Sequence, residues 1–437
     1  MALTLPKSPS GEQYEDLVAA CLRALGYFVE TRLTLREVSK EVLEVDAVAT
    51  PSGGSVADRI LVEAKKDGIS FGNVFKLYGQ RMYLGIGKAC LVSLKVPDKA
   101  ILDLYSSKGA EVGVKICNLG VTPEDILRLA DPKNGLSDIQ RLRVVAAGWY
   151  LQIARRVASA AFLHECKSHP DVDLLARART YFFNVRASFF QPTPLARAEA
   201  LYNAYLASPR LAGEMLTKAV DGKGVDIKDA WKKVADDAQW PWIQALMDTE
   251  SSARFAIIKN AFDDFVTRGS APPPEEEIQF GGLSLRLPLH ALPRSFVSGM
   301  EKLRGHAHFS RLPYLFQSFY DVLGGFLAFK DEEELAFLEA LTNIPKADLV
   351  SSLQLIDEFF SSDGKSMLYR QQDEILCLKM VPGFVHGCGA FLRQSLFGLK
   401  DYSTRYAKMG WLLGRWHQAG YRMLEAYLEK RSAETAA

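Results

Sequence analysis

Two β-rich runs between Glu41 and Lys65 constrain the fold of this chain more than any other stretch. A cluster of turn-forming residues, Pro51–Gly54, separates them. Such runs on either side of a Pro- and Gly-containing turn are typical of a β-hairpin. The apolar residues of the two runs are Val42, Val45, Val48 and Ala49, then Ile60, Leu61 and Val62.

Three charged residues interrupt these runs: Asp46 in the first, and Glu63 and Lys65 at the end of the second. Residues two apart in a strand point to the same face, so Glu63 and Lys65 should share one side. A neighbouring strand can bring Asp46 beside them. Because Asp is disfavoured in strands, its place in an apolar run favours a functional role. Two carboxylates and an amine predict a site for Mg²⁺, which takes oxygen ligands.

A helix is expected just before the hairpin. Ser10 and Gln13 have the spacing of a capping box, and Gly26 marks the end of the helix. The apolar stripe consists of Tyr14, Leu17, Val18, Cys21, Leu22 and Leu25. Glu15 lies on the flank of this stripe, where it could reach a site at the edge of the core.

The periodicity predicts a compact α/β domain over residues 1–120, with the order α-β-β-β-α-β-α-β and a mixed sheet. Gln80 falls in the helix that follows the hairpin. The expected elements are strands over Tyr27–Leu35, Ala89–Leu94 and Val112–Cys117, a helix over Asn73–Leu84, and a helix from Pro97 to Ser107.

The pattern of Glu15, Asp46 and Glu63-Ala-Lys65 on this frame resembles the PD-(D/E)XK nuclease superfamily, and most closely its Mrr-like restriction endonuclease branch. Gln80 matches the position of a Gln motif in that family. Two details depart from the family pattern. The residue before Asp46 is Val45 instead of Pro, and Tyr83 comes one residue before the position where the family often has Tyr.

The resemblance implies a metal-dependent endonuclease with a restriction-endonuclease-like fold. It implies that Asp46, Glu63 and the Ala64 backbone carbonyl bind Mg²⁺ or Mn²⁺, and that Glu15 acts through a water. Lys65 would orient the attacking water or stabilise developing charge, and Gln80 would position the backbone or the Lys65 amine. Basic residues near the site in sequence could contact phosphates. These are Lys66, Lys76, Arg81 and Lys88.

Beyond residue 120 the pattern predicts a large, mostly α-helical region. We divide it into a helical domain over 121–269 and a second one over 278–437, with the Pro- and Glu-rich linker Ser270–Glu277 between them. An element resembling a hairpin is expected over Ile278–Leu289. The expected helices are Ser137–Ser168, Leu174–Phe190, Leu195–Leu206, Pro209–Val220, Ile227–Met247, Ser251–Thr267, Arg294–Arg304, Leu312–Ala328, Glu332–Leu341, Lys346–Phe360, Phe384–Leu396 and Asp401–Lys430.

Composition and short motifs limit the partners and the cellular compartment expected for this chain. The net charge is only +1, so a surface for nucleic acid must be a local patch. The six cysteines include no Cys-x-x-Cys pair, which suggests reduced thiols in a cytoplasmic protein. No apolar run is long enough for a membrane span. No phosphate-loop motif is visible, so any sensing or ATPase activity would come from a partner protein.

These observations predict an endonuclease acting on nucleic acid, with DNA favoured over RNA, as the effector of a restriction or anti-phage defence system. Cutting both strands of a duplex needs two sites, which would suit a homodimer. One alternative is a DNA repair or junction-resolving nuclease. Another is a catalytically inactive nuclease fold that serves as a binding or assembly module.

Two further patterns have simpler readings. His164-x-Cys166, with His169 nearby, and His386-x-Cys388 each resemble half of a zinc site, but structural zinc sites usually have other spacings. Arginines recur along the helix expected at 137–168 and could line a groove or a partner interface. A solvent-facing helix surface is the simpler interpretation. They are Arg141, Arg143, Arg155 and Arg156.

Overall fold

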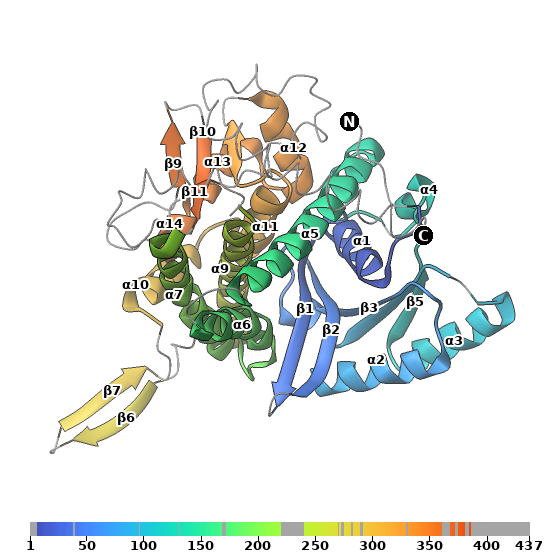
Figure 1. The fold of residues 1–437 in the computed structure, drawn as a ribbon, viewed down its shortest axis with the longest axis horizontal. Helices are drawn as coiled ribbons and strands as arrows, with labels where there is room; N and C mark the ends of the chain where they lie inside the picture. Colours follow the sequence, from blue (N-terminus) through green and yellow to red (C-terminus); the bar gives the residue numbers. More distant parts are fainter. Residues whose placement is uncertain are drawn as a thin grey trace.

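A five-stranded mixed sheet forms the core of the N-terminal region, and the remainder of the chain is largely helical (Figure 1). The computed structural model describes residues 7–37, 40–95, 97–129, 131–167, 172–219, 240–269, 271, 275–280, 283–288, 292–328, 331–360, 368–371, 375–380 and 384–385. Within them no helix is long and apolar enough to cross a membrane.

The N-terminal elements follow the expected order. The sheet order is β1-β2-β3-β4-β5, with β1, β2 and β3 antiparallel and β3, β4 and β5 parallel. The bounds are α1 Gly11–Ala24, β1 Tyr27–Glu37, β2 Lys40–Pro51, β3 Ile60–Lys65, α2 Phe71–Tyr83, β4 Lys88–Ser93, α3 Lys99–Glu111 and β5 Val114–Asn118.

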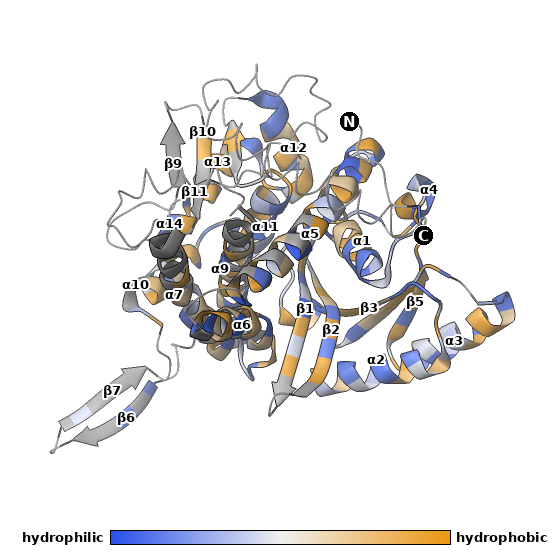
Figure 2. Cartoon of the chain, viewed as in Figure 1, coloured by the Kyte–Doolittle hydropathy of each residue, from blue (hydrophilic) through white to orange (hydrophobic). Residues whose placement is uncertain are grey.

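Local sequence explains the helix starts. The Ser10 hydroxyl accepts a hydrogen bond from the Gln13 amide, and the Gln13 side chain accepts one from the Ser10 amide, which is the predicted capping box. The same arrangement between Ser70 and Asn73 starts α2 two residues earlier than expected. In Figure 2, hydrophobic and hydrophilic segments alternate along α2 and α3, as expected for helices lying on a sheet.

The two faces of the sheet pack into different cores. Val62 and Ala64 join α1 in one core, whereas Leu61 and Leu91 join the buried side of α2 in the other. The first of these cores continues without interruption into the helical region and includes residues of α5, α9 and α11. The helical region therefore packs against the side of the sheet that α1 also covers.

The remaining elements are mostly helices. They are α4 Pro123–Leu127, α5 Asp138–Lys167, α6 Val172–Ala187, α7 Pro194–Ala219, α9 Trp240–Arg268, α10 Arg294–Leu303, α11 Leu312–Asp321, α12 Glu332–Thr342, α13 Lys346–Gln354 and α14 Ile356–Phe360. The strands are β6 Glu275–Phe280, β7 Leu283–Pro288, β8 Phe326–Ala328, β9 Leu368–Gln371, β10 Ile375–Met380 and β11 Phe384–Val385. β6 and β7 form the expected hairpin, which begins inside the predicted linker.

Several predicted boundaries in the helical region are wrong. The helices expected on either side of residues 207–208 form the single helix α7, and α9 runs unbroken through Asp248–Glu250. The helix expected over Leu312–Ala328 ends at Asp321, because Gly324 and Gly325 adopt positive φ and β8 follows. The start of the helix expected at Phe384 is strand β11. Residues 386–437 and 220–239, with the predictions made for them, lie outside the described residues.

Candidate active site

The hairpin of β2 and β3 brings Asp46 next to the end of β3. The ladder between these strands pairs Ala47 with Val62, and the next position would place Asp46 opposite Glu63. There the Asp46 side chain continues the pairing, because its Oδ2 atom accepts a hydrogen bond from the Ala64 amide over 2.8 Å. This bond ties the Asp46 carboxylate to the backbone of the Glu-Ala-Lys segment.

The strand alternation reverses at Asp46. Val45 and Val48 both pack into the core beneath α2, although an undisturbed strand would place them on opposite faces. On β1, Arg32 lies between Thr31, which pairs with Ala47, and Leu33, which pairs with Val45, and it has a φ of +56°. A positive φ at a non-glycine residue is uncommon and costs energy. The irregularity therefore lies at the residue on which the proposed chemistry depends.

Glu63 and Lys65 lie on the same side of β3, as the alternation predicts. The Lys65 Nζ atom is 2.6 Å from Glu63 Oε1, and Lys76 Nζ from α2 is 3.0 Å from the same oxygen. The Glu63 side chain is only 2% exposed, whereas those of Lys65 and Lys76 are 31% and 53% exposed. The buried Glu63 carboxylate thus forms ion pairs with two more exposed amines at the edge of the site.

The carboxylates also interact with one another. Burial and the nearby charge of Glu63 raise the pKa of Asp46 to about 7, although the Ala64 amide opposes this rise. Burial acts to lower the pKa of Lys65, but its hydrogen bond to Glu63 and the surrounding carboxylates raise that pKa overall. Carboxylates held together in this way are a common property of catalytic and metal-binding sites.

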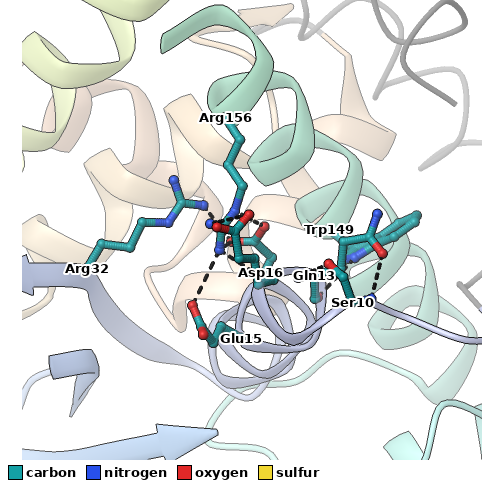
Figure 3. Close-up of polar contacts among 8 residues, drawn as sticks. Ser10, Gln13, Glu15, Asp16, Arg32, Trp149 and Arg156 are labelled. Atoms are coloured by element: carbon teal, nitrogen blue, oxygen red, sulfur yellow. Dashed lines mark hydrogen bonds and ion pairs between the residues drawn. The ribbon is translucent and has the colours of Figure 1, made fainter. Parts of the chain in front are cut away.

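Glu15, on α1, contributes to the same electrostatic environment. Its negative charge raises the pKa values of both Asp46 and Lys65. Burial raises the pKa of Glu15 itself, and the Arg156 guanidinium on α5 acts to lower it. The Arg156 Nη2 atom lies 3.4 Å from Glu15 Oε2 (Figure 3). Sequence reasoning missed this contact, since nothing in the local pattern around Arg156 points to α1.

Gln80 contacts the strand backbone. Its Nε2 atom donates a hydrogen bond to the Glu44 carbonyl over 3.0 Å, and its side chain is buried. Glu44 precedes Asp46 by two residues on β2. Gln80 therefore fixes β2 close to Asp46, which corresponds to the first of the two roles that the resemblance implies.

Two of the expected phosphate-binding residues lie elsewhere. Lys88 pairs with Ile60 at the start of β3, the opposite end of the strand from Lys65. Arg81 donates a hydrogen bond to the Gly87 carbonyl over 2.7 Å and so closes the loop after α2. Of the four candidates, Lys76 has a direct contact with a site residue, and Lys66 directly follows Lys65.

The donor set suits a hard divalent cation. In a strand the N–H and C=O groups of one residue face the same neighbour, so the Ala64 carbonyl faces β2 and Asp46. Asp46, Glu63 and this carbonyl offer only oxygen ligands. Among the described residues no group of three or more His, Cys, Asp or Glu side chains is arranged to hold a metal. Mg²⁺ commonly binds through one or two carboxylates and completes its shell with water and phosphate.

The described half of the zinc pattern does not form a site. His164 is exposed and Cys166 is buried on the same helix, so the two side chains diverge. His169, His386 and Cys388 lie outside the described residues. The solvent-facing interpretation of the α5 arginines holds for the exposed Arg143 and is wrong for Arg141, which is buried. It is also wrong for Arg155 and Arg156, whose side chains are 11% and 18% exposed and bind carboxylates of other helices.

No family model, curated protein or solved structure matches this chain.

Proposed function

We propose that this protein is a metal-dependent endonuclease that hydrolyses phosphodiester bonds in nucleic acid, with DNA favoured over RNA. The observation that carries the proposal is the Asp46 carboxylate bound to the Ala64 amide beside the Glu63–Lys65 pair. A restriction or anti-phage effector role, with the helical region recognising nucleic acid or a partner protein, belongs to the same proposal and rests on the resemblance.

Asp46, Glu63 and the Ala64 carbonyl would hold Mg²⁺ or Mn²⁺. When bound, such a cation activates water and neutralises charge on the phosphate. The water oxygen forms a bond to phosphorus and loses a proton to solvent. The bond from phosphorus to the leaving oxygen breaks, and that oxygen is protonated.

The protein's own amines have defined tasks in this reaction. Lys65 Nζ lies against Glu63 and is partly exposed, so it can donate a hydrogen bond to a phosphate oxygen as negative charge develops. Its raised pKa keeps the amine protonated for this purpose. Lys76 approaches the same carboxylate from α2 and offers a second cation to the nucleic-acid backbone.

The test is cleavage of plasmid DNA, single-stranded DNA and RNA in Mg²⁺, Mn²⁺ or EDTA. We expect cation-dependent cleavage by the wild type and a loss of about 10²-fold or more in Asp46→Ala and Lys65→Ala, the scale of losing one charge-stabilising group. Lys108→Ala is the matched control, because Lys108 forms an exposed ion pair with Glu111 on α3.

Three outcomes would count against the proposal. Equal cleavage by the wild type and both site variants would contradict the site assignment. Cleavage that persists in EDTA would contradict the metal dependence. A wild type that binds nucleic acid but cleaves none of these substrates in either metal would favour a binding or assembly module.

A further inference from the structure

Helix α5 of the helical region reaches the nuclease site through Arg156. The guanidinium contacts three residues within little more than one turn of α1: Nε lies 2.7 Å from Asp16 Oδ2, and Nη2 lies 2.8 Å from the Glu12 carbonyl oxygen and 3.4 Å from Glu15 Oε2 (Figure 3). One side chain from outside the α/β region therefore binds the segment of α1 that carries Glu15.

Asp16 is held from a second direction. Its side chain is 2% exposed, and its Oδ1 atom accepts a hydrogen bond from Arg32 Nη2 over 2.6 Å. Arg32 is the positive-φ residue of β1, where the ladder with β2 is interrupted. The ion cluster of Asp16, Arg32 and Arg156 thus joins α1, β1 and α5 at the place where the sheet is irregular.

The same cluster adjoins the carboxylates of the site. Arg32, bonded to Asp16, lies on β1 between the residues that pair with Ala47 and Val45, the two neighbours of Asp46 on β2. The charge of Glu15 also raises the pKa values of Asp46 and Lys65. Within the described residues, Arg156 is the cation paired with Glu15. The Glu15 side chain is 30% exposed, so without this contact it could turn toward water.

We propose that Arg156 is a positioning residue of the nuclease site. By holding Glu15 and Asp16 together, it keeps the Glu15 carboxylate within reach of a cation bound by Asp46 and Glu63. The helical region then completes the site, and residues 1–120 would lack one of its supports. This inference rests on the proposed function.

A purely structural role makes a different prediction. If Arg156 only neutralised the buried Asp16, its loss would lower stability and would weaken cation binding equally with or without a functional Glu15. If it acts through Glu15, its effect on cation binding should disappear once Glu15 can no longer contribute. A double-mutant cycle measures this difference.

The experiment measures Mn²⁺ binding to the full chain by calorimetry for the wild type, Arg156→Gln, Glu15→Gln and the double variant. Arg128→Gln is the control, because Arg128 is 76% exposed in a surface pair with Asp125. We expect Arg156→Gln to weaken Mn²⁺ binding about tenfold, the usual scale for a residue supporting a metal ligand. In the Glu15→Gln background the same change should have less than about a twofold effect. The Mg²⁺ concentration for half-maximal cleavage should shift in parallel.

Thermal unfolding of each variant shows whether weaker Mn²⁺ binding comes from a loss of folding. If Arg156→Gln does not fold, Arg156→Lys replaces it in the same cycle, since Lys retains a charge for Asp16 but lacks the fork that spans Asp16 and Glu15. An equal loss in both backgrounds, or no loss in the wild-type background, would overturn the inference. A wild type that neither binds Mn²⁺ nor cleaves nucleic acid would instead overturn the proposed function and this inference with it.

Discussion

Two groups of charges in this molecule follow opposite rules. In and around the helical region, buried charges are matched with opposite ones: Asp321 of α11 binds Arg23 of α1 and Arg155 of α5, and Lys259 binds Asp263 over 2.5 Å. At the hairpin, burial raises the pKa of the Asp46 carboxyl, and the charges of Glu63 and Glu15 raise it further. In the first arrangement opposite charges are paired, whereas in the second Glu63 and Glu15 have cationic partners but also act on the neighbouring Asp46 carboxyl.

This difference separates a structural charge from a functional one. A buried charge without a partner is expensive, so a network that only supports the fold is expected to be neutralised internally. A site that binds a cation or a phosphate must keep some charge for its ligand. The crowded carboxylates beside exposed amines are therefore the stronger indication of function, even though the helical network holds more charges.

The largest expected effect comes from breaking the matched network. Asp321→Asn removes the carboxylate that binds Arg23 and one of the two that bind Arg155, and we expect a loss of about 3–5 kcal/mol in the free energy of unfolding. Denaturant titration measures it, with the 80% exposed Asp67 changed to Asn as the control. A loss below about 1 kcal/mol would mean that the helical charges are not the structural network described above.

At the site, by contrast, removing a carboxylate should increase the free energy of unfolding. A carboxyl whose pKa is about 7 in the folded protein, against the ordinary 3.8, destabilises the fold once it is ionised. Asp46→Asn should therefore raise the free energy of unfolding in EDTA by about 1–2 kcal/mol above pH 7, a value reduced from the full pKa difference because Asp46 is partly exposed.

The pH dependence provides the check on this prediction. The stability difference between Asp46→Asn and the wild type should shrink as the pH falls from 7 and vanish below about 4, where both states of the wild type are protonated. Denaturant titrations at several pH values measure it. A stability difference that does not change with pH, or a variant less stable than the wild type, would contradict the raised pKa that burial and the nearby Glu63 charge give Asp46.

The comparison also explains what sequence could predict. The capping box at Ser10, the hairpin and the shared side of Glu63 and Lys65 follow from contacts between near neighbours, so local pattern was enough. The reversal at Asp46 could not be predicted, because the ladder of β1 and β2 is interrupted there, at Arg32, whose positive φ and ion pair with Asp16 of α1 leave no mark in the local pattern.

The helical region was harder for the same physical reason. Asp248 and Glu250 look like a break between two helices, yet both are buried inside the continuous helix α9. Asp248 binds Arg155 of α5, and Glu250 binds Arg254 of α9. A helix buried on all sides has no polar face from which periodicity can be measured. Arg156 was missed similarly, since its carboxylate partners lie on α1, far away in sequence.

The smallest expected effect on stability belongs to Lys76, which touches Glu63 but is 53% exposed. Lys76→Ala should change the free energy of unfolding by less than about 0.5 kcal/mol, since exposed ion pairs contribute little.

If Lys76 serves the phosphate backbone, the variant should bind DNA more weakly, and the salt dependence of binding should lose about one phosphate contact. Lys88→Ala is the matched control, because Lys88 is an exposed lysine at the opposite end of the strands. Filter binding over a range of salt concentrations measures the affinity for DNA and its salt dependence in each variant. An equal change in the two variants would show that the basic charge acts over the whole surface, and a change in stability without a change in salt dependence would place Lys76 among the structural charges.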